Sequence, residues 1–157
     1  MQIDIKKAAA RISGQVLQTP LFYSKYLSAL NKGQVYLKLE NEQYTGSFKA
    51  RGALNKILGL SSSEKAKGLI TASTGNHAQG FARALEIANA EGTIFLPTNA
   101  EASKVEALKA YKVGLQFHGA DALTTELHAM KFAEASGQIW ISPYNDPEVI
   151  AGQGTLA

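Results

Sequence analysis

Apolar and polar residues repeat with two periods along the chain, and segments of one period alternate with segments of the other. Residues 35–40 (VYLKLE) place Val35, Leu37 and Leu39 on one side of an extended chain, which predicts a strand. The same reasoning gives helices at 3–13, 47–59, 76–89, 101–112 and 121–136, further strands at 68–73, 93–97, 113–118 and 138–142, and irregular connections at 19–30 and 59–67. Such alternation predicts an α/β fold in which right-handed βαβ units form a parallel sheet.

One lysine occupies a position that is suited to covalent chemistry. A polar, glycine-containing turn follows the strand at 35–40, and Ser47 is expected to cap the next helix, so that Lys49 falls in its first turn. The positive end of the helix dipole disfavours an ammonium there, and a neutral lysine amine is what Schiff-base chemistry requires. The alternative is a solvated lysine beside Arg51.

A second candidate segment, ASTGNHAQG at 72–80, lies between a predicted strand and a predicted helix. Its small hydroxyl residues, glycine and asparagine suit a loop whose backbone N–H groups cradle a carboxylate or a phosphate. Gly75 would permit a tight backbone, while Ser73, Thr74 and Asn76 can hydrogen-bond ligand oxygens. Ordinary helix capping is the alternative role. Because both candidate segments follow strands, we expect them to meet at the carboxyl edge of the sheet.

The two motifs, TGSFKARGA at 45–53 and STGNHAQG at 73–80, together resemble the signature of the fold-type II pyridoxal-phosphate enzymes, whose fold is tryptophan synthase β-like. Within that family the chain is most similar to the threonine and serine dehydratase branch, which includes serine racemase. The segments FLPTNAEASKVEALKAY (95–111) and SPYNDPEVIAGQGTLA (142–157) extend the resemblance over essentially the whole chain. The residues beside the lysine and in the loop differ from those of the sister cysteine synthase branch.

The resemblance implies a role for each residue of the two motifs. Lys49 would form a Schiff base with pyridoxal phosphate and then act as the base that removes the substrate α-proton. Phe48 would pack against the cofactor ring, and a place in the protein core does not exclude this; Asn76 would hydrogen-bond the cofactor's phenolic oxygen. The side chain of His77 is expected to pack rather than to catalyse. The substrate carboxylate would be held, largely by backbone N–H groups, by Ser73, Thr74, Gly75, Asn76 and His77.

The implied reaction is a β-elimination of the threonine/serine ammonia-lyase type, in which L-threonine or L-serine becomes a 2-oxo acid and ammonia. In serine racemases of this branch, the position of Thr74 is a serine that acts as an acid and base, so racemase activity is one alternative. Another is a dehydratase of a different β-substituted amino acid, such as hydroxyaspartate, a diamino acid or a hydroxyectoine-derived compound. A third, of another class, is a noncatalytic amino-acid-binding fragment.

Members of this branch are much longer than 157 residues, and their second half supplies a glycine-rich phosphate loop and a divalent-cation site. We therefore expect a truncated, amino-terminal portion without a metal site of its own, whose activity alone is left open. By resemblance, 1–67 would belong to the large domain with the cofactor lysine, 68–146 would form a small α/β domain, and 147–157 would begin the return to the large domain. Without the second half, apolar surface on the helices at 3–13 and 47–59 would be exposed, which favours aggregation or oligomerisation. The full-length parent is expected to be a homo-oligomer, a dimer or a tetramer.

Composition narrows the possible partners. The net charge is +3, and the lysines are spread without a dense run, which favours a solvated surface over nucleic-acid binding. There is no cysteine, and the histidines at 77, 118 and 128 are too far apart to show a metal-ligand spacing. No stretch approaches the roughly 20 apolar residues that span a bilayer, and the amino terminus lacks the apolar core of a secretory signal. We therefore expect a cytoplasmic enzyme with a small-molecule substrate and without membrane or nucleic-acid partners.

Overall fold

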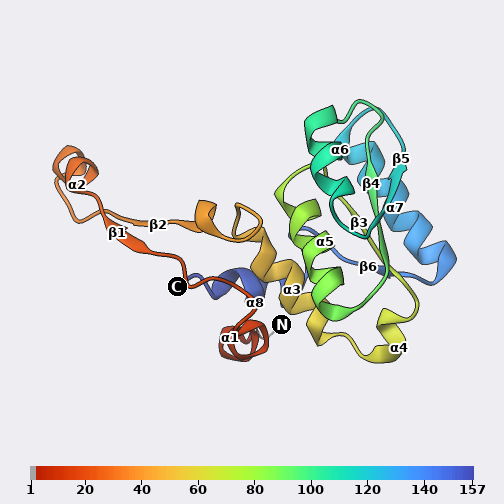
Figure 1. The fold of residues 1–157 in the computed structure, drawn as a ribbon, viewed down its shortest axis with the longest axis horizontal. Helices are drawn as coiled ribbons and strands as arrows, with labels where there is room; N and C mark the ends of the chain where they lie inside the picture. The colour runs from red at the N-terminus through yellow and green to blue at the C-terminus, as the bar shows by residue number, and fades with distance from the viewer. Residues whose placement is uncertain (1–2) are drawn as a thin grey trace.

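The computed structural model describes residues 3–157 and contains a four-stranded parallel sheet (Figure 1). Its strands are β3 (Leu69–Ala72), β4 (Gly92–Leu96), β5 (Gly114–Phe117) and β6 (Ile139–Trp140). They lie in the order β5-β4-β3-β6, with Leu69 of β3 opposite both Gly92 and Ile139. The predicted α/β fold with a parallel sheet is confirmed.

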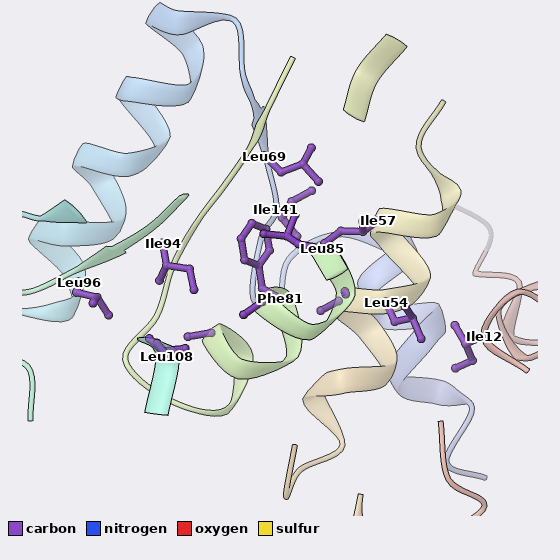
Figure 2. Close-up of a cluster of buried hydrophobic side chains, with 14 residues drawn as sticks. Ile12, Leu54, Ile57, Leu69, Phe81, Leu85, Ile94, Leu96, Leu108 and Ile141 are labelled. Atoms are coloured by element: carbon purple, nitrogen blue, oxygen red, sulfur yellow. The ribbon is translucent and has the colours of Figure 1, made fainter. Parts of the chain in front are cut away.

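Side chains alternate between the two faces of β3 and β4, so that each face has its own core. The covering helices are α5 (Asn76–Ala88), α6 (Ala102–Lys109) and α7 (Ala122–Ser136). Leu69 and Ile94 pack with residues of α5 and α6, whereas Ile70 and Phe95 pack with residues of α7. Figure 2 shows Phe81 of α5 pointing into the cluster between the sheet and the next helix layer. The sheet therefore has helices on both faces, as expected for a parallel sheet.

A further layer of helices lies beyond α5. Its members are α1 (Ile5–Ile12), α3 (Lys49–Gly59) and α8 (Pro147–Gly154), and α3 contacts α1, α5 and α8. The backbones approach closely: a Cβ on Gly80 of α5 would lie 3.1 Å from the Ala50 Cα, and one on Gly152 of α8 would lie 2.7 Å from the Gly52 Cα. The predicted apolar exposure is wrong for most of the helix at 47–59, because these neighbours enclose it, although Phe48 is exposed. On the helix predicted at 3–13, Ile3 and Ile5 are exposed, as expected.

Residues 20–39 form an arm that extends away from the sheet (Figure 1). Two short strands, β1 (Leu21–Tyr23) and β2 (Tyr36–Lys38), pair antiparallel and flank α2 (Lys25–Asn31). The strand predicted at 35–40 is therefore confirmed in type but does not join the parallel sheet, because its only partner is β1 within the described residues. The arm exposes large apolar side chains: Leu21, Phe22, Tyr23, Tyr26, Leu30, Tyr36 and Leu37.

Several short elements lie where the sequence predicts irregular chain. The segment 19–30 holds β1 and most of α2, and the connection at 59–67 holds α4 (Ser62–Lys65). Ser61 and Glu64 form a capping box at the start of α4, which explains why four residues suffice for a helical turn. A 3-10 turn, η1 (Glu40–Glu42), follows β2. The helix α8 begins at Pro147, and the carboxylate of its N-cap residue, Asp146, accepts two backbone N–H bonds.

None of the helices in the described part of the chain combines the length and the apolar character needed to cross a membrane.

Candidate active site

Lys49 is the first residue of α3, so the prediction that it lies in the first helical turn is confirmed. Its Nζ donates to the Pro143 carbonyl oxygen at 2.9 Å, and its side chain is half-buried. The expected N-cap is shifted by one residue: Phe48 takes that position with helical backbone angles and no capping side chain, while the Ser47 Oγ accepts from the Lys49 N–H at 3.3 Å. Gly46 has a φ of +66°, which explains the glycine in the preceding turn.

Phe48 is 39% exposed, so it is not a core aromatic of its helix. The Lys49 Nζ lies 5.5 Å from the centroid of the Phe48 ring. An aromatic face is therefore available to a planar group that approaches the lysine amine.

The loop Ser73–Gly75 lies at the carboxyl end of β3 and leads into α5, as predicted. The Ser73 N–H donates to the Phe95 carbonyl oxygen at 3.3 Å, and the Gly75 N–H donates to the Ser73 Oγ at 3.2 Å. Gly75 is the N-cap of α5 and makes no side-chain capping bond, and Asn76 is exposed at the first helical position. An uncapped N-terminus of a 13-residue helix offers N–H groups and a positive dipole end to an anion.

The backbone and the surroundings of Gly75 describe the space in this loop. Gly75 has a φ of −127°, so it does not require the left-handed region. A Cβ at this position would meet no heavy atom within 4 Å. The side of Gly75 where a Cβ would stand is therefore open space.

His77 is the second residue of α5 and is 2% exposed. Its Nε2 lies 3.1 Å from the Thr71 Oγ1. Burial, together with the nearby positive charge of Lys49, lowers the pKa of His77 from the ordinary 6.5 to about 3. The imidazole is therefore neutral at physiological pH, in agreement with the expected packing role of this side chain.

Two contacts bring the lysine and the loop together. Gly80, one turn into α5, packs against the backbone of Lys49 and Ala50. A Cβ added to Gly80 would lie 3.1 Å from the Lys49 carbonyl carbon. The hydrogen bond from Lys49 to Pro143 joins the same turn to the segment that follows β6. Three segments therefore converge: the start of α3, the start of α5 and the end of β6.

A buried ion pair that the sequence did not predict anchors the first turn of α3. Arg51 and Glu40 are 5% and 9% exposed, and two hydrogen bonds of 2.8 Å join their side chains. Arg51 also donates to the Leu17 carbonyl oxygen, and Thr19 donates to Glu40. Burial raises the pKa of Glu40, but the bonds from Arg51 and Thr19 outweigh it and hold that pKa below 4.5. The sequence offers one indication of this pair. Arg51 lies two residues after Lys49, which places the two side chains on opposite sides of the helix.

Two of the three histidines meet in space although they are distant in sequence. The rings of His118 and His128 stack with centroids 3.5 Å apart, and Phe95 lies edge-on to His128. Among residues 3–157, no group of three or more histidine, aspartate or glutamate side chains is arranged to hold a metal ion.

Comparison with known proteins gives a consistent set of relatives. The chain is 46% identical over 154 residues to the L-threonine dehydratase catabolic TdcB of Staphylococcus aureus. The aligned region covers 98% of this chain and 44% of that protein. Among solved structures it is similar to the serine racemase from Dictyostelium discoideum (TM-score 0.88, 34% identity, 98% of this chain and 50% of that one). It is also similar to threonine deaminase isoform 2 from Solanum lycopersicum (TM-score 0.87, 36% identity, 97% and 43%).

The chain thus spans about half the length, or less, of these relatives. A family model described as pyridoxal-phosphate dependent enzyme matches residues 12–157, which include the lysine turn, the loop before α5 and the end of β6. The chain therefore belongs to the pyridoxal-phosphate dependent enzyme family.

Proposed function

We propose that this chain provides the lysine-bearing part of a pyridoxal-phosphate dependent ammonia-lyase that converts L-threonine or L-serine to a 2-oxo acid and ammonia. The single observation that supports the site is the position of Lys49. Its amine is half-buried, hydrogen-bonds the Pro143 carbonyl, and lies where the starts of α3 and α5 meet the end of β6. The threonine dehydratase and threonine deaminase relatives support the reaction.

The residues present fit pyridoxal phosphate. Lys49 offers an amine, the Phe48 ring is exposed beside it, and Asn76 is exposed at the uncapped start of α5. In this arrangement Lys49 would hold the cofactor, Phe48 would contact its ring and Asn76 would donate to its phenolic oxygen. When bound, the cofactor supplies an electron sink for the charge that develops at the substrate α-carbon.

The loop before α5 is proposed to orient the substrate. Backbone N–H groups at the start of a helix bind carboxylates well, and the open space at Gly75 admits one. Ser73 and Thr74 add hydroxyl groups to this cradle, while His77 contributes its backbone N–H rather than its buried side chain. A substrate held there would lie near Lys49, because the start of α5 contacts the start of α3.

Proton transfer falls to Lys49. Its Nζ would take the α-proton, and the Pro143 carbonyl is an acceptor that can hold the resulting ammonium. Hydrogen bonding to a carbonyl limits the directions in which the amine can point, so the α-proton is taken on one side. The β-hydroxyl group leaves with a proton as water, so that one hydrogen and one hydroxyl group are lost in total.

A serine racemase is the second candidate, and one observation favours it. The Thr74 hydroxyl is half-buried in the loop and has no hydrogen bond within residues 3–157. A free hydroxyl at this place could serve as a second acid and base. The Dictyostelium discoideum relative is described as a serine racemase.

We also propose the wider arrangement of the protein. The return of α8 to α1 and α3 supports a large domain that includes 1–67 and 147–157, with 68–146 as a smaller α/β domain. The exposed apolar arm supports a homo-oligomer. A divalent cation, if the full-length parent binds one, would be held by residues outside 3–157. The metabolic relatives support a place in the cytoplasm.

The test begins with cofactor binding and then turns to turnover. The purified chain is mixed with pyridoxal phosphate, and absorbance is scanned for a band near roughly 410 nm, the signature of a protonated Schiff base. Lys49→Ala should abolish the band, whereas Lys109→Ala, at an exposed lysine, should keep it. Ammonia and 2-oxo acid are then assayed with L-threonine and L-serine, and D-serine is assayed for racemisation.

A Lys49-dependent band together with 2-oxo acid would support the lyase, and D-serine would support the racemase. A band without any turnover would point to the noncatalytic binding fragment. A spectrum that is the same in the wild type and in Lys49→Ala would overturn the proposed role of this lysine.

A further inference from the structure

A pair of buried polar side chains, Thr71 and His77, lies directly behind the candidate site. Thr71 is 0% exposed at the end of β3, and His77 is 2% exposed in the first turn of α5. The Thr71 Oγ1 donates to the Ile141 carbonyl oxygen at 2.8 Å and lies 3.1 Å from the His77 Nε2. A buried polar pair of this kind needs matched donors and acceptors.

The hydrogen-bond arrangement determines the tautomer of His77. A hydroxyl group has one proton, and the Ile141 carbonyl can only accept, so the Thr71 proton is committed to that bond. With Thr71 donating to Ile141, the 3.1 Å contact is a hydrogen bond only when the His77 Nε2 carries a hydrogen and donates it to Thr71. The Nδ1 is left as an unprotonated acceptor, buried and without a partner among residues 3–157.

The same two side chains are connected to the lysine through the end of β6. Ile141 precedes by two residues Pro143, whose carbonyl oxygen accepts from the Lys49 Nζ at 2.9 Å. Between them, the Ser142 Oγ accepts from the Asn145 N–H at 2.9 Å, which closes the turn that presents this carbonyl. A displacement of Ile141 would therefore displace the acceptor of the lysine amine.

We propose that Thr71 and His77 are positioning residues that set the location of the Pro143 carbonyl and, through it, of the Lys49 amine. Neither side chain needs to touch substrate or cofactor for this role. The inference rests on the proposed function for its importance, because Lys49 is the reactive group of that function. The hydrogen bonds that carry the inference are present without the cofactor. The low pKa of His77 agrees with it, since an imidazolium would place a second positive charge beside Lys49.

The first measurement is the tautomer of His77 in the chain without cofactor. Long-range proton–nitrogen correlation NMR should show a hydrogen on Nε2 and none on Nδ1, unchanged from pH 8 to pH 5. Thr71→Ser keeps the hydroxyl and should preserve this pattern, whereas Thr71→Val removes it and should give a mixture of tautomers. A hydrogen on Nδ1 in the wild type would overturn the proposal even if a variant failed to fold.

The second measurement follows the lysine itself. Each chain is treated with an amine-labelling reagent in the absence of cofactor, and the rate at Lys49 is read by mass spectrometry against the exposed Lys109 of the same molecule. Loss of one hydrogen bond should raise the Lys49 rate by about fivefold in Thr71→Val and in His77→Phe, with the wild-type rate restored in Thr71→Ser. Equal Lys49 rates in folded wild type and Thr71→Val would refute the positioning role, whether or not the chain binds pyridoxal phosphate.

Discussion

The parallel sheet and the arm are both built from strands of two to five residues, yet they differ in what covers them. In the sheet, β3 and β4 are enclosed by α5 and α6 on one face and by α7 on the other, and all four residues of β3 are buried. In the arm, β1 and β2 pair with each other, and all three residues of β1 are exposed. Backbone pairing alone therefore forms a local strand pair, whereas a second layer is needed to bury it.

The difference has a consequence for where stability and chemistry lie. Most of the fully buried large side chains belong to the sheet and the helices that pack on it, while the arm exposes four aromatic side chains, Phe22, Tyr23, Tyr26 and Tyr36. The three segments of the candidate site are tied to the well-packed region through Gly80, Thr71 and Pro143. We expect substitutions there to act on both stability and Lys49, and substitutions in the arm to act on neither.

The largest expected effect tests the comparison directly with two phenylalanines. Phe81, fully buried between the sheet and α3, should cost about 3–5 kcal/mol of unfolding free energy when changed to alanine, because a large cavity remains. Phe22 is 58% exposed in the arm, so its change to alanine should lower the unfolding free energy by less than about 0.5 kcal/mol. Urea unfolding followed by circular dichroism measures both. Similar losses in the two variants would show that the arm is packed as well as the sheet.

The next prediction concerns the ion pair that holds the lysine turn. Arg51→Met leaves the buried Glu40 carboxylate without its partner and should cost about 3 kcal/mol. Lys109→Met breaks an exposed pair with Glu106 and should cost within about 0.5 kcal/mol. Because the pKa of Glu40 is held below 4.5, its contribution is present above that pH and is lost as the pH falls; Arg51→Met should reduce this loss. Denaturant midpoints at pH 7 and pH 4 measure both effects, and an unchanged midpoint in Arg51→Met would contradict the prediction.

A third prediction uses glycines from the two regions. Gly80→Ala forces a methyl group to within 3.1 Å of the Ala50 backbone and should cost about 2 kcal/mol through the α3–α5 contact. Gly33→Ala, between α2 and β2 of the arm, places its Cβ 3.8 Å from the Asn31 carbonyl oxygen, which is ordinary van der Waals contact, and should change stability by less than about 0.5 kcal/mol. Thermal unfolding provides the comparison. A stable Gly80→Ala chain would mean that α3 can shift without cost.

The smallest effect is a pH dependence in the buried region. His77 has an ordinary pKa of 6.5 when unfolded and about 3 when folded, so the unfolded chain binds more protons as the pH falls. Unfolding free energy should therefore decline by roughly 1.5 kcal/mol between pH 6.5 and pH 5 because of this residue. His77→Gln should lack that part of the decline. The same slope in wild type and His77→Gln would exclude this histidine as its source.

Much of the sheet could be predicted because its information is local. Strands and helices alternate with clear periods, and the turn residues before Lys49 and before Asn76 place both side chains at helix starts. Membership of one structural family followed from two short motifs. The site residues themselves remain predictions, since what supports them is their convergence rather than a bound ligand.

What could not be predicted depends on contacts between distant positions. The pairing of Glu40 with Arg51, and of Thr71 with Ile141, has no periodic signal because each involves one side chain in a specific direction. The arm was misassigned for a related reason: its three-residue strands are too short to show which sheet they join.

The close contact at Gly80 fixes how near the first turn of α3 can lie to α5. A methyl group on Gly80 would lie 3.1 Å from the backbone of both Lys49 and Ala50, so a side chain larger than a hydrogen atom would press on this turn. Because the backbone of Lys49 is part of the contact, any separation of the two helices at this point would move the lysine with it. The spacing of the two helix starts is therefore set by a side chain that is missing.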